Sequence, residues 1–132
     1  MEKIENLLKK CGTFMLATVE GDKPKLRVLG VVDHFEGKLF FYLDQEKDAY
    51  HEITKNANVE IVGLAEDCNQ VHVSGKAVFD FREEVAQYLK DHHLFINKKY
   101  SQAGAPKLAP FYIEDMHAFV VKKDDTVEHI LN

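Results

Sequence analysis

The chain has 132 residues, of which 45% are hydrophobic and 30% are charged, which is the composition of an ordinary globular protein. A chain of this length buries roughly two-thirds of its unfolded surface, so we expect a single domain, residues 1–132, whose core needs no disulfide or metal. The formal net charge is -5, with acidic and basic residues interspersed. This argues against binding to nucleic acid or to a membrane surface, because both depend on clustered positive charge.

The cellular location is predicted from the N-terminal residues and the cysteines. Residues 1–10 are charged and amphipathic, unlike an apolar signal sequence. The longest apolar runs fall far short of the roughly 20 residues that span a bilayer. Cys11 and Cys68 form no Cys-x-x-Cys or Cys-x-x-His pattern, and two separate cysteines are typical of a reduced intracellular chain. We therefore expect a cytoplasmic protein.

The first third of the chain predicts one helix and three strands. Apolar residues recur at helical spacing over residues 2–10, and Gly12 is a natural stop. Strands are expected at residues 13–20, 25–33 and 38–43, with a Gly-Asp-Lys-Pro turn between the first two. The apolar run that ends the second strand predicts that both faces of this strand are covered.

The remaining elements alternate between short helices and strands. Gly75 in the middle of a long alternating segment predicts a bulge or a sharp bend, of the kind that barrels use to close. The expected helices are 47–56, 82–92 and 93–100, and the expected strands are 59–65, 70–81, 108–113 and 118–122, with 126–131 as a further candidate.

This order of elements predicts a mainly β fold. Short, regularly spaced strands with Gly and Pro turns favour a sandwich or a small barrel over a parallel sheet that alternates with helices. The helical segments after the long strand are the one long connection in the predicted chain of hairpins. We therefore expect a β-barrel with a few helices.

Two cations are candidates for an anion-binding site. Arg27 lies inside the second predicted strand, and Lys47 lies where a polar loop becomes a helix. Charge-assisted hydrogen bonds from such residues hold phosphate groups strongly. Each residue also has a plainer interpretation, because an exposed strand arginine or a lysine in the first turn of a helix needs no ligand.

Other catalytic patterns are not recognisable. There is no Ser/His/Asp pattern, paired carboxylate or Gly-rich phosphate loop. The seven histidines are scattered, and the adjacent His92 and His93 point to different sides of a helix, so we predict no metal site.

Several segments together resemble one known family, the pyridoxamine 5'-phosphate oxidase-like, FMN-binding split-barrel proteins. Their order and spacing carry the resemblance more than any single motif does. The segments are Gly21 to Gly30, Glu36 to Phe41, Lys47 to Tyr50 with Ile53 and Asn56, Val59 to Ile61, Val73 to Ala77, and Phe111 to Ile113.

The resemblance implies a split β-barrel that forms a homodimer and binds FMN in two symmetric grooves at the dimer interface. By analogy, the cofactor contacts fall on eight residues: Arg27 and Lys47 at the phosphate and ribityl end, the backbone of Val28 and Leu29 against the flavin ring, Tyr42 and Leu43 at the border of the groove, and Gln70 and His72 reaching over from the partner subunit.

The sequence also departs from the family pattern. Family members usually have Thr or Ser near Leu43, where a hydroxyl donates to the phosphate, and many carry Trp and Arg near Gln70 and His72. Asp44 and Glu46 add negative charge beside the proposed phosphate site. True pyridoxamine 5'-phosphate oxidases are longer and end in an Arg-Leu-x motif that is missing here, so that activity is not expected.

Three hypotheses about function follow. The first is an FMN-dependent oxidoreductase that passes electrons from NAD(P)H to a small acceptor; it needs no catalytic motif, because the cofactor carries the electrons. The second is a non-catalytic module of the same fold that binds flavin or haem as a sensor or store. The third is a structural barrel that has lost its ligand.

Overall fold

Eight antiparallel strands form one open sheet in the computed structural model, which describes residues 1–131. The predicted domain 1–132 includes Asn132, which lies outside the described residues. The strand order is β2-β1-β5-β6-β7-β4-β3, and β8 pairs with β7. The mainly β prediction is confirmed, and the open sheet is consistent with a split barrel. The strands are β1 (Phe14–Glu20), β2 (Lys23–Leu29), β3 (Asp33–Phe35), β4 (Lys38–Asp44), β5 (Asn58–Leu64), β6 (Gln70–Phe79), β7 (Leu108–Val121) and β8 (Val127–Leu131).

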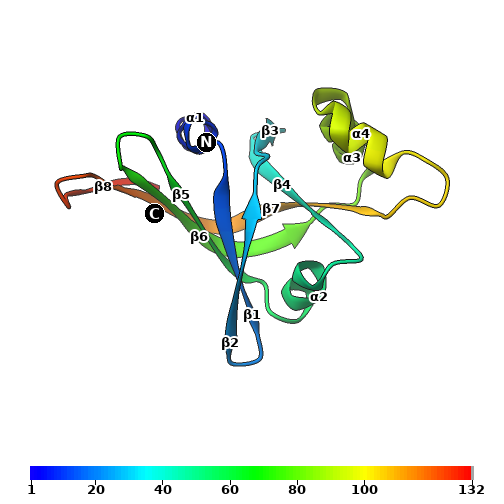
Figure 1. Ribbon diagram of the computed structural model, residues 1–132, viewed down its shortest axis with the longest axis horizontal. Coiled ribbons are helices and arrows are strands. Elements are labelled where there is room, and N and C mark those ends of the chain that lie inside the picture. Colours follow the sequence, from blue (N-terminus) through cyan, green and yellow to red (C-terminus); the bar gives the residue numbers. More distant parts are fainter. Residues whose placement is uncertain (132) are drawn as a thin grey trace.

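Four short helices accompany the sheet, and all four predicted helices are confirmed to within one residue at each end. Figure 1 shows α2 beside the β1–β2 hairpin, whereas α3 and α4 form a pair at one end of the β6–β7 part of the sheet. None of the helices within residues 1–131 combines the length and apolar character that crossing a bilayer requires. The helices are α1 (Glu2–Cys11), α2 (Asp48–Lys55), α3 (Glu83–His92) and α4 (Leu94–Tyr100).

Two groups of buried side chains hold the fold together. The larger one includes the stacked rings of Phe41 and Phe111, whose centroids lie 5.5 Å apart, and reaches α1 and α2. The smaller one joins α3 and α4 to the loop between β2 and β3, with Val31, Leu89 and Ile96 among its members. The smaller group therefore fixes the α3–α4 pair beside the loop that follows β2.

The predicted strand 25–33 is wrong in its second half. The chain leaves the sheet after Leu29 and re-enters as β3, which pairs with β4. Val28 is 59% exposed, whereas Val31 and Val32 are buried. The reason is that β2 lies at the edge of the sheet, and the apolar run continues into a crossing segment that packs into the core. The expectation that both faces of this strand are covered is therefore also wrong.

The two strands predicted at 108–113 and 118–122 are one continuous strand, β7. Both halves pair with β6, and the register shifts at Gly75, between Ser74 and Lys76. Gly75 has a φ of 156°, and Asp115 on the facing strand has a φ of 52°. The bulge predicted at Gly75 is thus confirmed: the register advances by two residues in β6 and by three in β7, so β7 carries one extra residue opposite Gly75.

Replacing Gly75 by Ala is expected to destabilise the protein. A Cβ atom there would lie 2.5 Å from the Glu114 carbonyl oxygen and 2.5 Å from Ile113 Cγ2, so the two strands must separate. We expect the free energy of unfolding to fall by about 2–3 kcal/mol, as for other overpacked sites. Gly30→Ala is the control, because nothing lies within 4 Å of a Cβ at that position. Equal unfolding midpoints in denaturant for the two variants would contradict this account of the bulge.

Candidate functional site

A cleft of about 330 Å³ opens where β2, β4, α2 and α4 meet. This volume lies within the usual range of small-molecule sites. The walls combine apolar strand residues with three cations, one carboxylate and two tyrosines. The lining residues are Arg27, Val28, Leu29, Gly30, Val31, Tyr42, Leu43, Asp44, Lys47, Ala49, Lys99 and Tyr100.

Six of the eight residues predicted to bind the cofactor line this one cleft. The other two, Gln70 and His72, lie on β6 and are not among its lining residues. The fold therefore brings together residues from separate strands and a helix, as the family pattern requires. The role of all eight as cofactor ligands remains a prediction. The six are Arg27, Val28, Leu29, Tyr42, Leu43 and Lys47.

Arg27 is held by a hydrogen-bonded triangle behind the wall of the cleft. Its Nη2 donates to Glu52 Oε1 at 2.7 Å and to Thr18 Oγ1 at 3.2 Å. The Thr18 hydroxyl in turn donates to the same Glu52 oxygen at 2.7 Å. The Glu52 side chain is 6% exposed, so its charge is compensated almost entirely by these two neighbours. Among residues 1–131, Arg27 Nε is the one buried side-chain nitrogen or oxygen without a hydrogen-bond partner.

Local structure explains how the triangle forms. Thr18 follows Phe14 and Leu16 at the inward positions of β1, and Arg27 lies opposite Leu16 on β2. Glu52 lies on the buried face of α2. The hairpin and the helix are thus joined by an ion pair of short length and low exposure.

A second polar cluster lies at the α4 side of the cleft. Asp44 is 6% exposed, and its Oδ2 accepts a hydrogen bond from the Tyr100 hydroxyl at 3.3 Å. Lys99 Nζ lies 3.8 Å from the same oxygen. The Tyr42 and Tyr100 rings meet edge to face with centroids 6.1 Å apart. This cluster fixes α4 against the end of β4.

The hydroxyl groups of the two tyrosines in this cluster keep their protons at neutral pH. Burial, together with the negative charge of Asp44, raises the pKa of Tyr42 above its ordinary value. The same causes raise the pKa of Tyr100 further. Both hydroxyls therefore stay protonated across the physiological range. The Tyr100 hydroxyl donates to Asp44, and the Tyr42 hydroxyl can donate to a ligand.

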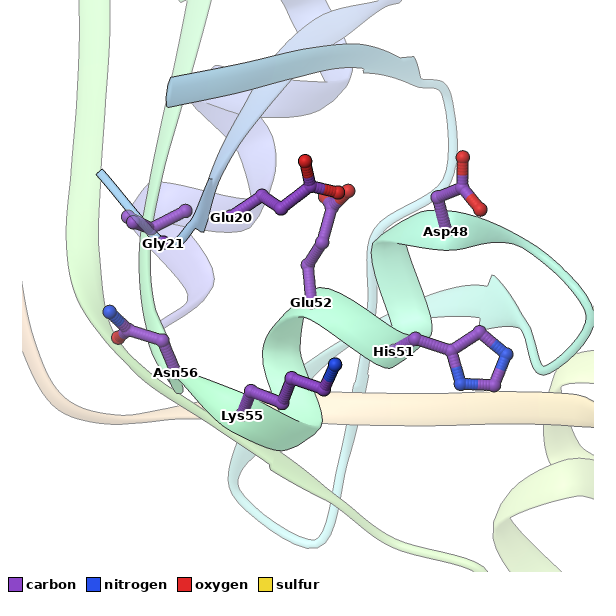
Figure 2. A pocket seen from close by; sticks show the side chains of 8 residues that line it. Glu20, Gly21, Asp48, His51, Glu52, Lys55 and Asn56 are labelled. Carbon is purple, nitrogen blue, oxygen red and sulfur yellow. The ribbon is translucent and has the colours of Figure 1, made fainter. Parts of the chain in front are cut away.

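A second cavity, of about 400 Å³, lies on the other side of the Arg27–Glu52 pair and is drawn in Figure 2. It lies between the tip of the β1–β2 hairpin and α2. Glu20 approaches from the hairpin, and Glu52 and Asp48 from the helix. Arg27 lines the first cleft and Glu52 the second cavity, so the ion pair forms part of the wall between them.

The outer face of the sheet carries a row of exposed and half-buried side chains that crosses six strands, called the exposed row below. The row is continuous in the pairing register, and Met15 and Val28 in it are 45% and 59% exposed. The rings of His72 and Phe119 stack within the row, with centroids 4.7 Å apart and planes inclined by 5°. Gln70 lies beside the row, with Oε1 3.1 Å from His72 Nε2. The row runs Val28, Met15, Val62, His72, Phe119, His129.

Several residues of the site were missed in the sequence. Glu52 carried a usable signal, because it interrupts the apolar stripe of Ala49 and Ile53 on a short helix. A charged residue on such a stripe indicates a buried partner. The sequence holds no such signal for Lys99 and Tyr100, because their approach to Asp44 depends on how α4 folds back over the sheet.

Comparison with known proteins identifies the family to which the chain belongs. The sequence model of the family described as Pyridoxamine 5'-phosphate oxidase matches residues 1–122. The chain belongs to this family. No curated protein matches the chain.

Several solved structures are similar to this chain in fold. A NimC/NimA family protein from Clostridium acetobutylicum is 27% identical, with 98% of this chain and 93% of that chain covered and a TM-score of 0.89. A pyridoxamine 5'-phosphate oxidase-related, FMN binding protein from Nostoc punctiforme is 13% identical, with 98% and 93% covered and a TM-score of 0.57. A haem binding protein from Mycobacterium smegmatis is 11% identical, with 98% and 57% covered and a TM-score of 0.76.

Removing one partner of the buried ion pair is expected to destabilise the protein. Arg27→Met leaves the Glu52 carboxylate buried without its cation. We expect the free energy of unfolding to fall by about 2–4 kcal/mol, somewhat less than for a fully buried pair, because Arg27 is 24% exposed.

The double variant Arg27→Met, Glu52→Met provides the control for this loss. It removes both charges, so it is expected to recover most of the stability in chemical denaturation. A double variant that is no more stable than Arg27→Met alone would show that the unpaired carboxylate is not the cause.

Proposed function

We propose that the protein is an FMN-binding flavoprotein that passes electrons from NAD(P)H to a small acceptor, with the cofactor held at the interface of a homodimer. The observation that carries the proposal is the convergence of six family-inferred residues on one cleft in a chain that belongs to the pyridoxamine 5'-phosphate oxidase family. When bound, FMN supplies the hydride and electron chemistry, and the protein supplies binding and orientation.

The cationic end of the cleft supports binding of the phosphate. Arg27 and Lys47 both line it, and Arg27 Nε is a buried donor for which residues 1–131 provide no acceptor. A phosphate oxygen is a strong acceptor for a guanidinium N–H. Leu43 offers no hydroxyl at this position, so the phosphate would be held by these two side chains without the usual Ser or Thr contact.

The strand end of the cleft supports placement of the flavin ring. Within residues 1–131, β2 pairs with β1 alone, so its other edge presents unpaired backbone N–H and C=O groups. Val28, Leu29 and Gly30 of this strand end line the cleft. Their backbone can meet the polar edge of a flat ring, while the Tyr42 side chain closes the opposite wall.

The exposed row on the outer sheet face supports a homodimer. The row is apolar and aromatic over most of its length, and it begins at Val28, which also lines the cleft. Apolar side chains that gather at the surface, such as Met15 and Val28 here, are typical of an interaction site. A second copy that covers this face would bring its own Gln70 and His72 toward the opening of the cleft and complete the groove.

A haem-binding module is the second candidate, because one structure of similar fold is a haem binding protein. Haem iron is usually held by His, Cys or Met. None of these residue types is among the twelve that line the cleft in residues 1–131. Tyrosinate ligation is disfavoured as well, because burial raises the pKa of both Tyr42 and Tyr100. Within one subunit, the lining of the cleft therefore favours flavin over haem. In the proposed dimer, the partner's His72 is the candidate axial ligand for haem.

The absorbance spectrum of the purified protein tests the choice of cofactor and of function. We expect flavin absorbance, acquired from the cell or on addition of FMN, that is bleached under anaerobic conditions by NADH or NADPH. A flavin spectrum that neither nucleotide bleaches favours the non-catalytic module, and a Soret band favours haem. Protein that acquires no colour with added FMN contradicts both flavin functions.

Lys47 is expected to act on the phosphate rather than on the ring. Lys47→Ala should weaken FMN binding by about tenfold, the loss of one charge-assisted contact, and leave riboflavin binding unchanged. Quenching of flavin fluorescence gives both dissociation constants. Lys55→Ala is the matched control, because this lysine lies on the same helix but lines the other cavity. Equal losses of affinity for FMN and for riboflavin would show that Lys47 does not contact the phosphate.

The dimer is tested at Met15, an exposed residue of the row that lies beside Val28. Met15→Glu places a charge on a side chain that is 45% exposed, so the fold should tolerate it while the interface should not. Sedimentation should show a dimer for the unmodified protein and a monomer for the variant, with FMN binding lost together with the dimer. Thr54→Glu, on the exposed side of α2, is the control. A monomeric unmodified protein would contradict the shared groove.

A further inference from the structure

We propose that Glu52 is a specificity-determining residue of the cleft, which makes the anion subsite at Arg27 weak for a dianionic phosphate and leaves FMN readily exchangeable with solution. This inference rests on the proposed function, since it concerns the same cleft. It assigns to Glu52 an effect on the ligand in addition to its place in the fold.

The hydrogen bonds show how Glu52 competes with a ligand for Arg27. Nη2 of Arg27 already donates to Glu52 Oε1 at 2.7 Å and to the Thr18 hydroxyl at 3.2 Å. A bound phosphate therefore meets a guanidinium whose Nη2 is engaged. The Thr18 hydroxyl is also committed, because it donates to the carboxylate at 2.7 Å. The remaining donors of Arg27 are Nε and Nη1.

The charges around Arg27 also favour weak binding of a phosphate. The carboxylate of Glu52 is 6% exposed and lies against the guanidinium, so it cancels much of the positive charge that a phosphate would meet. Behind it, the second cavity carries two further carboxylates, Glu20 and Asp48, and one cation, Lys55 (Figure 2). Lys47 is then the main uncompensated cation at this end of the cleft. A phosphate with two negative charges is poorly matched by such a site.

Burial makes the effect of Glu52 substantial. A charge at the protein surface is screened by water and salt, whereas a buried carboxylate within about 7 Å of a phosphate is screened much less. Coulomb's law at an effective dielectric constant of about 20 to 40 gives roughly a tenfold or larger change in affinity for removal of such a charge.

The test uses Glu52→Gln, which removes the charge and retains an amide oxygen that can accept from Arg27 and Thr18. We expect FMN to bind about tenfold more tightly and to dissociate more slowly, with the affinity for riboflavin unchanged. Glu20→Gln is the matched control: it removes a charge from the second cavity, which Glu52 also lines, but Glu20 is exposed, and the hydrogen bonds of Arg27 go to Glu52 and Thr18. It should change the FMN-to-riboflavin ratio much less.

Inorganic phosphate provides a readout that does not depend on flavin. NMR shifts of the Arg27 side-chain N–H groups on titration with phosphate should show tighter binding to Glu52→Gln than to the unmodified protein. Glu52→Asp, which retracts the carboxylate by one methylene, should move affinity in the same direction and replaces Glu52→Gln if that variant does not fold.

The outcomes separate this inference from the proposed function. Tighter phosphate binding in the variant, without flavin binding in any form of the protein, supports the role of Glu52 and contradicts the flavoprotein. Flavin binding with an FMN-to-riboflavin ratio that Glu52→Gln leaves unchanged or lowers overturns the role of Glu52 and leaves the flavoprotein intact. A merely structural Glu52 would alter unfolding and not this ratio.

Discussion

The ion pair between Arg27 and Glu52 joins the two parts of the chain on which the cleft depends. Arg27 belongs to an edge strand that pairs with β1 alone among the described strands, and Glu52 belongs to a short helix that also buries Ala49 and Ile53 in the core. A buried carboxylate is costly unless a cation and further hydrogen bonds compensate it, so Glu52 can be buried in this position only because Arg27 and Thr18 contact it. The same constraint places a cation at the wall of the cleft.

The open form of the sheet determines where a ligand and a partner can bind. Within residues 1–131, β2 lies at one end of the strand order and β3 at the other, and the loop between them crosses the cleft. The cleft is therefore bounded by an unpaired strand edge on one side and by α4 on the other. Because Val28 belongs both to this edge and to the exposed outer row, cofactor binding and dimer formation are expected to depend on each other.

Much of the fold was predictable, because local patterns determine it. Helical spacing located three of the helices, the fourth was predicted as a continuation of the third, and Gly75 marked the bulge between β6 and β7. The end of β2 at Leu29 was not predictable, because an apolar run is equally typical of a covered strand and of a segment that crosses into the core. The joining of two predicted strands into β7 depends on the pairing of both halves with β6, which is a tertiary effect. At the cleft, Arg27 and Lys47 were candidates because of their places in a predicted strand and at the start of a predicted helix, whereas the contact between Arg27 and Glu52 is visible only when α2 is packed against the hairpin.

A crystal structure of the protein with bound FMN tests the central claim most directly. The account predicts the phosphate within hydrogen-bond distance of Arg27 and Lys47, the ring against the backbone of β2, and Gln70 and His72 of the partner subunit over the opening of the cleft. Arg27 should keep its bond to Glu52 in that complex. A flavin bound elsewhere, or in this cleft with its phosphate directed away from Arg27, would contradict the account.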